Sequence, residues 1–300
     1  MNARSAPWLR AGQIFCMTVS MLAASALPGM AQDTSPASSD LHALLPDSIK
    51  QSKVIMLATD AHHPPCEYFG GPHGEMIGFE PDLWNEIGKR LGVTIKPVSI
   101  DFDGLIPSIQ SQRFDIAMQC ISDSAEREKQ VLFVDYGYAS TLIFALESNQ
   151  TISRDPLSLC GMKAATQIGT DFSASVADIS QRCVAQGRSP IAASQFNSTA
   201  AVLLALGSGR VDFVLDDGGA VEEIRQASRR PIKVLDVGIP NLMIGAIMKP
   251  DNTKLAQSWL AALQQIQQDG TYDQIMKKWH TEMLSMPPVM NGATKNQKSQ

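Results

Sequence analysis

The sequence lacks several features that mark common classes of protein. No two cysteines have the CxxC spacing of a zinc site, and no internal repeat indicates a solenoid. Basic residues are not in excess, because 25 Lys and Arg stand against 30 Asp and Glu, a formal net charge of -5. We therefore expect no metal, no cofactor and no nucleic acid, and no anionic membrane surface as the main partner.

The length and composition are those of an ordinary globular protein. Of the 300 residues, 44% are hydrophobic and 18% are charged. A chain of this length can form one large domain or two modest lobes, each with its own core.

The N-terminus has the pattern of a signal peptide. Arg4 and Arg10 precede an apolar run at 14–27, and Gly29 and Ala31 have the spacing that a signal peptidase accepts. We therefore expect the first 31 residues to be a signal peptide, cleaved after Ala31, and the protein to be exported.

Two alternatives to a cleaved signal peptide are less favoured. The apolar run is short for a membrane anchor and ends at Pro28 and Gly29. Cys16 lies inside the run and is not preceded by small residues, which argues against a lipoprotein.

The cysteine count agrees with an oxidising compartment. Four cysteines remain after the predicted cleavage, an even number that allows three pairings. They are Cys66, Cys120, Cys160 and Cys183.

The rest of the chain alternates between short apolar runs and amphipathic patterns. The apolar runs predict strands at 53–59, 93–100, 114–121, 163–168, 211–216, 232–235 and 242–248. The amphipathic patterns predict helices at 81–91, around 105–109, and at 172–185, 198–206, 220–227, 253–268 and 272–284, with Asn197 as an N-cap. Such alternation is typical of parallel sheets covered by helices.

Polar loop segments follow several of the predicted strands. In open α/β sheets, ligands bind beyond the carboxyl ends of the strands, so these loops hold the candidate site residues. The loops lie at 60–68, 101–103, 120–127, 169–172 and 216–218.

Six segments stand out by their residues and by their order along the chain. They are Thr59–Tyr68, Gly74–Gly92, Asp101–Glu128, Ile168–Thr170, Gly209–Asp217 and Asp269–His280. Together they resemble the amino-acid-binding group of periplasmic solute-binding proteins of ABC transporters, family 3. The resemblance extends over residues 53–280.

The resemblance implies an α/β fold of the periplasmic binding protein type. Two lobes, each a mostly parallel sheet flanked by helices, would be joined by a two-strand hinge. Lobe 1 would comprise residues 50–139 and 246–285, and lobe 2 residues 140–245. The composition of the flanking segments predicts a linker at 32–49 and a flexible tail at 286–300.

The resemblance also implies a charged contact from each lobe. Arg127 would grip a ligand carboxylate through its planar guanidinium, assisted by Ser122. Asp217 would pair with the ligand ammonium, since each charge of a desolvated zwitterion needs a partner. Judged by spacing alone, Arg127 is a solvated helix arginine, and Asp217 can equally be a helix cap.

Three further residues are candidates in lobe 1. Asp60 would reach a distal ammonium group of a basic ligand, or else form an Asx turn. Phe102 matches an aromatic residue that stacks on the ligand side chain. His63 and Cys66 depart from the family, which usually has aromatic residues at both places; His63 is either a ligand contact or an exposed loop imidazole.

The loop at 169–171 carries one match and one departure. Thr170 suits a carboxylate at a helix N-terminus. The family usually has a small hydroxyl residue where this chain has Asp171, and a second acid there would repel a ligand carboxylate. We expect Asp171 to cap the helix or face away; if it faces the ligand, the ligand is not a plain α-amino acid.

The resemblance implies a disulfide between Cys160 and Cys183, which would stabilise lobe 2 by roughly 3 kcal/mol. Cys66 and Cys120 follow strands that a doubly wound order makes neighbours. They form either a second disulfide or two unpaired thiols on the floor of the ligand site, which makes Cys120 a candidate ligand contact.

These interpretations predict a monomer that captures an amino acid or a similar zwitterion and delivers it to an ABC permease in the inner membrane. One rival is a cyclohexadienyl-dehydratase-like enzyme that would use His63, Cys66 and Cys120. The sequence has no evident nucleophile–base pair, which favours binding without turnover. The other rival is a receptor that presents its closed form to a sensor protein.

Overall fold

A computed structural model describes residues 37–297, which lie in one compact unit. The predicted signal peptide, residues 1–31, lies outside the described residues.

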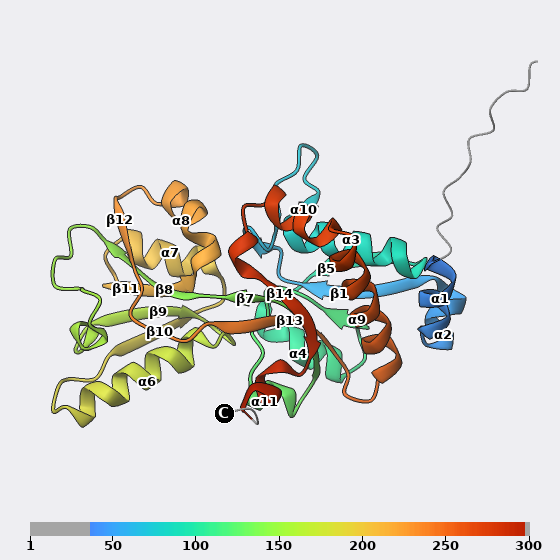
Figure 1. Ribbon diagram of the computed structural model, residues 1–300. Coiled ribbons are helices and arrows are strands. Elements are labelled where there is room, and N and C mark those ends of the chain that lie inside the picture. The colour runs from blue at the N-terminus through green and yellow to red at the C-terminus, as the bar shows by residue number, and fades with distance from the viewer. Residues whose placement is uncertain (1–36, 298–300) are drawn as a thin grey trace, which may run out of the picture. The chain divides into compact units, whose positions relative to one another are not determined.

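The described chain contains helices and strands in alternation (Figure 1). The helices are α1 Ala37–Leu44, α2 Asp47–Ser52, α3 Phe79–Leu91, α4 Leu105–Gln110, α5 Ala125–Glu128, α6 Phe172–Ala185, α7 Thr199–Gly207, α8 Val221–Ala227, α9 Thr253–Gln268, α10 Thr271–Lys278 and α11 Gly292–Gln297. The strands are β1 Val54–Thr59, β2 His62–His63, β3 Glu67–Phe69, β4 Met76–Ile77, β5 Thr94–Ser99, β6 Ile116–Ala117, β7 Leu132–Ala139, β8 Thr141–Leu146, β9 Lys163–Gln167, β10 Ala192–Phe196, β11 Phe213–Asp217, β12 Ile232–Leu235, β13 Leu242–Met248 and β14 Ser285–Met290.

The first lobe is built on a six-stranded sheet in the order β14-β7-β13-β6-β1-β5. Strand β1 runs parallel to β5 and β6, whereas β13 runs antiparallel to β6 and β7. Helices α3 and α9 bury Trp84 and Trp259 in the core of this lobe. A second cluster around Phe133 involves α4.

The second lobe is built on a five-stranded sheet in the order β10-β9-β11-β8-β12. Strands β10 and β11 run parallel to β9, and β8 runs antiparallel to β11 and β12. Two apolar clusters cover this sheet, one with Val176 of α6 and one with Val202 of α7. The α/β class and the two lobes are confirmed, but each sheet is mixed rather than mostly parallel, because the strands near the hinge run antiparallel.

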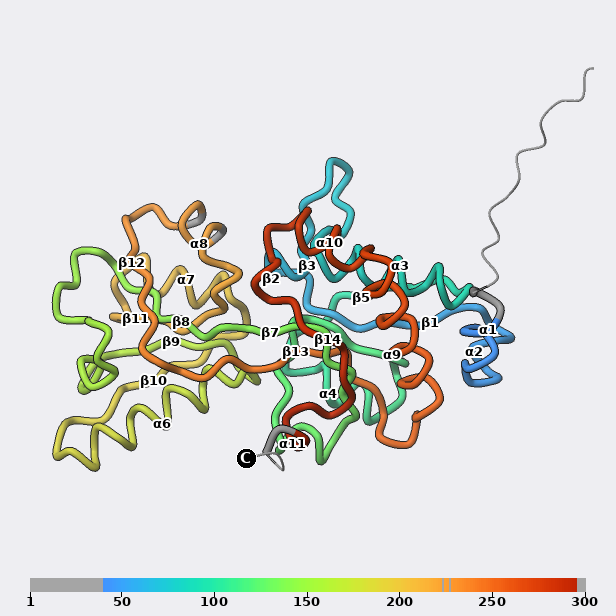
Figure 2. Tube along the Cα trace, in the orientation of Figure 1, coloured from blue at the N-terminus to red at the C-terminus, as the bar shows by residue number. Residues whose placement is uncertain are grey.

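The chain passes between the lobes twice, as Figure 2 shows. Strand β7 ends at Ala139 and β8 begins at Thr141, so a single residue, Ser140, separates them. The return crosses at 236–241, and β13 begins in the sheet of lobe 1, where Leu242 pairs with Ala139. The expected boundary at 246 is therefore wrong, because all of β13 belongs to lobe 1.

The expected linker at 32–49 is also corrected where the structure describes it. Helix α1 packs against α3 and α9, and the ring Nδ1 of His42 lies 2.8 Å from the carbonyl oxygen of Leu91. Leu45 is fully buried, and Ile49 of α2 is buried beside it in the core. Leu45 lies between the two helices, so no single helical pattern connects it to Ile49, and the surrounding Ser, Pro and Asp residues favoured a linker.

The expected flexible tail at 286–300 is ordered as far as residue 297. Strand β14 pairs with β7, and α11 is tied to lobe 1 by carboxylates. Asp135 accepts a hydrogen bond from the backbone N of Gly292 at 2.9 Å, and Asp123 accepts one from Ala293 at 3.0 Å. Burial raises the pKa of Asp123 to about 7 and that of Asp135 to about 8.

Most predicted elements are present, with some changes of extent. The strand expected at 114–121 is reduced to β6, and the helix expected at 272–284 ends at Lys278. The N-cap of α7 is Ser198, not Asn197, since its side chain accepts from the backbone N of Ala201. Strand β10 was not predicted.

Candidate functional site

The loops that follow β1, β9 and β11 meet the start of α6 and the loop before α5 around a cavity of about 40 Å³. This cavity has room for only a few water molecules, so an amino-acid-sized molecule would enter only if the lobes separated. The lining residues come from both lobes. They are His63, Phe102, Gln119, Cys120, Ser122, Ala139, Thr141, Gln167, Thr170, Asp171, Phe172, Asp217 and Leu242.

Arg127 lies in α5 and is not among the residues that line this cavity; it lines a second cavity with Phe102 and Gly169. The helix is capped by Ser124, whose hydroxyl accepts from the backbone N of Arg127 at 3.4 Å. The Arg127 guanidinium is buried, and its Nη1 donates to the carbonyl and hydroxyl oxygens of Ser122 at 2.6 and 2.8 Å. Burial lowers the pKa of Arg127 from its ordinary value, and the charge of Asp171 opposes this shift.

Asp171 faces the cavity, contrary to the expectation that it caps the helix or faces away. It stands at the N-cap position of α6 but makes no side-chain cap hydrogen bond. Its Oδ2 lies 2.6 Å from Nη1 of Arg127 and also contacts the hydroxyl of Ser122. The Asp171 carboxylate therefore pairs with Arg127 of the other lobe and not with the backbone N–H groups at the start of its own helix.

Two more contacts join the lobes beside this ion pair. Nη2 of Arg127 donates to the carbonyl oxygen of Gly169 at 2.8 Å, and Nε2 of Gln167 donates to Oδ2 of Asp60 at 3.1 Å. Gly169 has φ +82, and a Cβ there would lie 3.2 Å from the Cα of Asp103, so the close approach requires glycine.

Asp60 and Thr170 are engaged by the protein itself. Asp60 is buried, and its Oδ1 lies 2.7 Å from Nδ1 of His62, so the structure pairs it with His62 and Gln167. It is not among the cavity-lining residues given above. The hydroxyl of Thr170 lines the cavity but donates to the carbonyl oxygen of Gln167 at 2.7 Å.

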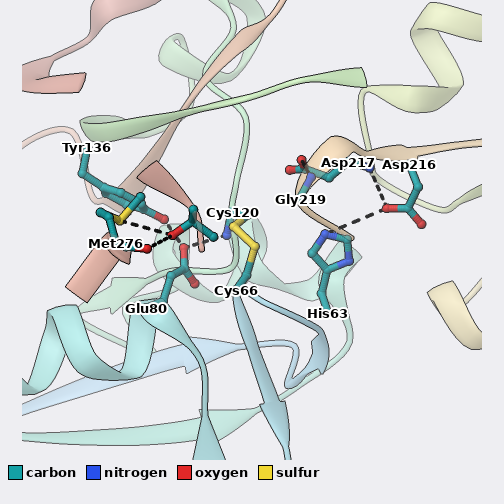
Figure 3. The surroundings of a disulfide bond; sticks show 10 residues. His63, Cys66, Glu80, Cys120, Tyr136, Asp216, Asp217, Gly219 and Met276 are labelled. Carbon is teal, nitrogen blue, oxygen red and sulfur yellow. Dashed lines mark hydrogen bonds and ion pairs between the residues drawn. A yellow bond between two sulfur atoms is a disulfide. The ribbon is translucent and has the colours of Figure 1, made fainter. Parts of the chain in front are cut away.

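Asp216 and Asp217 end β11 and point in opposite directions, as Figure 3 shows. Asp216 turns toward His63, with 3.9 Å between Oδ1 and the ring Nε2. His63 is buried and lines the cavity, so it is not an exposed loop imidazole. Burial raises the pKa of Asp216, and the nearby His63 lowers it.

Asp217 lines the cavity without a cationic partner among residues 37–297. It is only 4% exposed, and its Oδ1 accepts from the backbone N of Gly219 at 2.8 Å. Burial raises the pKa of Asp217 to about 6, although the bond from Gly219 and the nearby His63 oppose the rise. Burial of a carboxylate without a cationic partner is energetically unfavourable.

The disulfide between Cys66 and Cys120 forms part of the cavity floor (Figure 3). Their Cα atoms are 6.1 Å apart. Glu80 of α3 fixes this bond in place, because its Oε1 accepts from the backbone N of Cys120 at 2.7 Å and from the hydroxyl of Tyr136.

In lobe 2, Cys160 and Cys183 form the disulfide that the resemblance implied, with Cα atoms 5.6 Å apart. It joins the segment before β9 to α6.

Sequence reasoning missed several lining residues. Gln119 and Gln167 stand at strand ends, where their position was a usable signal. Phe172, Ala139 and Leu242 gave no signal, since apolar residues at element ends are ordinary. Phe102 lines the cavity as expected for a residue of the loop after β5, in the short 3₁₀ helix Phe102–Gly104.

The sequence matches a known protein family over most of its length. The model of the bacterial extracellular solute-binding proteins, family 3, matches residues 55–282. The chain belongs to this family. Among residues 37–297, no helix of this family 3 protein is both long and apolar enough for a membrane span.

Two similar proteins are named for basic amino acids. The lysine/arginine/ornithine-binding periplasmic protein of Escherichia coli K12 is 27% identical over 88% of this chain and 97% of its own length. A solved ancestral arginine-binding protein bound to arginine is 28% identical, with a TM-score of 0.69 over 76% of this chain and 98% of that one.

A third similar protein, the second with a solved structure, is related to an enzyme. It is an ancestral amino-acid-binding protein described as a precursor of cyclohexadienyl dehydratase, 25% identical with a TM-score of 0.69. It covers 78% of this chain and 98% of its own.

Proposed function

We propose that this protein captures an amino acid, or an amino-acid-like compound with a positively charged group, between its two lobes. The observation that carries the proposal is Asp217, a buried carboxylate that lines the shared cavity with no cation beside it in the described residues. Leaving such a group unpaired costs several kcal/mol, which a ligand ammonium would recover.

The remaining candidate contacts are assigned by position around the cavity. Phe102 would cover the apolar part of the ligand, and His63 would contact it from the side of Asp216. The ligand would also contact Ser122, Cys120 and Thr170, which line the same cavity. Asp60 would act through Gln167, which lines the cavity in its place.

The names of similar proteins support a basic amino-acid-like ligand. The Escherichia coli relative is named for lysine, arginine and ornithine, and the ancestral protein was solved with arginine. Each of these ligands carries a distal cation in addition to its ammonium group, and the carboxylate of Asp217 could pair with one of these cations.

Closure would link ligand binding to transport. A ligand held by residues of both lobes favours the closed form, and a transporter can respond to that form. We infer that the protein works in the periplasm and delivers its ligand to the permease of an ABC importer, as its family membership supports.

Binding without turnover is favoured over catalysis. A dehydratase-like use of Cys66 and Cys120 would need a free thiol, and the two are joined in a disulfide. His63 faces Asp216 rather than a nucleophile. The similar ancestral structure is itself described as an amino-acid-binding protein.

A thermal-shift panel of neutral, acidic and basic amino acids and of amines tests the proposal. A positively charged compound at large excess over its Kd should stabilise the protein by about 3–4 kcal/mol. Asp217→Asn should weaken binding roughly 30-fold or more, because one partner of a buried charge pair is lost. Asp236→Asn is the matched control, since Asp236 accepts from Gly238 in the same kind of turn but is exposed.

The proposal is wrong if only neutral or acidic compounds stabilise the protein. It is also wrong if Asp217→Asn and Asp236→Asn bind a positively charged compound equally well.

A further inference from the structure

The guanidinium of Arg127 is satisfied by the protein itself. Nη1 contacts Ser122 and Asp171, and Nη2 donates to Gly169. The terminal nitrogens that would form a fork around a carboxylate therefore already have acceptors from both lobes.

The acceptor supplied by Asp171 has the chemistry of a ligand carboxylate. It lies in lobe 2 at the start of α6, opposite Arg127 in lobe 1, and its Oδ2 is 2.6 Å from Nη1. The Asp171 carboxylate also contacts the hydroxyl of Ser122. The carboxylate of Asp171 therefore occupies the position beside Arg127 where the resemblance would place the carboxylate of a bound ligand.

A carboxylate on the ligand would meet two penalties here. It would have to break the Arg127–Asp171 ion pair, and it would then lie close to the displaced Asp171, a like charge in a partly buried site. An amine without a carboxylate would meet neither penalty, and its cation could pair with Asp217, which has no cationic partner among the described residues.

We propose that Asp171 takes the place of the ligand carboxylate, so that the site selects organic cations without a carboxylate, namely diamines and guanidino-amines, over the basic amino acids of the same length. This inference rests on the proposed function and narrows its ligand class. The Arg127–Asp171 pair closes the lobes around the ligand, and Asp217 holds the ligand's cation.

Two pairs of probes isolate the carboxylate. Agmatine differs from arginine, and putrescine from ornithine, by the absence of the carboxylate alone. We expect isothermal titration of the purified protein to give at least about tenfold tighter binding for the better amine than for its amino acid, because like-charge juxtaposition costs more than 1.4 kcal/mol.

Asp171→Ser restores the small hydroxyl that the family usually has at this position. It should weaken the preference for the amine by about tenfold or reverse it, because Arg127 is then free for a ligand carboxylate. Asp178→Ser is the matched control, since Asp178 is an exposed acid on the same helix; it should leave the ratio of affinities unchanged. Asp171→Asn, which keeps the shape, provides a second variant if the serine variant does not fold.

The inference is overturned if arginine or ornithine binds as tightly as its amine, or if neither Asp171 variant changes the ratio of affinities. In both cases the proposed function survives, since a cation is still bound. If none of the four probes binds and a neutral amino acid does, the proposed function fails together with the inference.

Discussion

Two neighbouring aspartates at the end of β11, Asp216 and Asp217, point in opposite directions because side chains alternate along a strand. Asp216 turns to His63, and Asp217 turns to the cavity shared by the lobes. Both are buried, and burial raises the pKa of each. Among residues 37–297, only Asp216 forms an ion pair with His63. Asp217, whose side chain accepts from the backbone N of Gly219, has no ion-pair partner there and is the one that faces the cavity.

The raised pKa of Asp217 makes ligand affinity depend on pH. Its carboxyl has a pKa of about 6 in the folded protein, so it is charged at pH 8 and mostly protonated at pH 5. The affinity for a cationic ligand should be constant above pH 7 and fall about tenfold between pH 7 and pH 5, because a neutral carboxyl cannot pair with an ammonium group. Isothermal titration across this range measures the effect.

The Asp217→Asn variant provides the reference for that titration. Its weaker binding should not vary with pH over the same range. Equal affinity of the unaltered protein at pH 8 and pH 5 would contradict the assignment of Asp217 as the cation partner.

For single residues, the sequence was a good guide to which side chains surround the cavity. It was a poorer guide to the partners that those side chains contact. Ser122, Thr170 and Asp217 follow strands, and their place beyond the carboxyl ends is a consequence of sheet topology. The orientation of Asp171 was predicted wrongly, because its partner Arg127 lies on the other lobe. A contact between two lobes depends on how the lobes pack against each other, and a local sequence pattern gives no information about that packing.

At the scale of elements, helical spacing proved a better guide than composition. Helices α6 and α9 and strands β12 and β13 have the predicted bounds, since each has an unbroken apolar pattern. Helices α1 and α2 were missed, although Leu45 between them and Ile49 of α2 enter the core of lobe 1. Short helices gain their stability from packing, and packing is invisible in a six- or eight-residue window.

Two adjacent leucines test whether the N-terminal helices are part of the folded core. Leu45→Ala should lower the free energy of unfolding by about 2–4 kcal/mol, because Leu45 is fully buried. Leu44→Ala should change it by less than about 0.5 kcal/mol, since Leu44 is 46% exposed. Urea unfolding of both variants measures the difference, and equal values would mean that this segment is a linker after all.

At the scale of the whole molecule, each lobe has its own disulfide, and the two bonds differ in task. The Cys160–Cys183 bond spans 23 residues and lies within the helical layer of lobe 2. The Cys66–Cys120 bond spans 54 residues and forms part of the cavity floor. We therefore expect the Cys160–Cys183 bond to stabilise lobe 2 alone, and the Cys66–Cys120 bond to stabilise both lobe 1 and the ligand site.

Paired serine variants separate these tasks. Loss of the Cys160–Cys183 bond should lower stability by about 3 kcal/mol and leave ligand affinity unchanged. Loss of the Cys66–Cys120 bond should lower stability by about 4 kcal/mol, because the longer loop is released, and should also weaken binding severalfold. Chemical denaturation and titration of both variants are the measurements. Weaker binding in the first variant, or unchanged binding in the second, would contradict this division.

The anchoring of both ends of the described chain on lobe 1 has a practical consequence for measuring motion. Because α1 and α11 both attach to that lobe, lobe 2 is an insertion with no chain end of its own. A pair of dyes at residues 40 and 295 would keep a fixed separation through every cycle of capture and release. A dye pair that reports the opening of the lobes needs one dye on α1 or α11 and the other at an exposed position of α6 or α8.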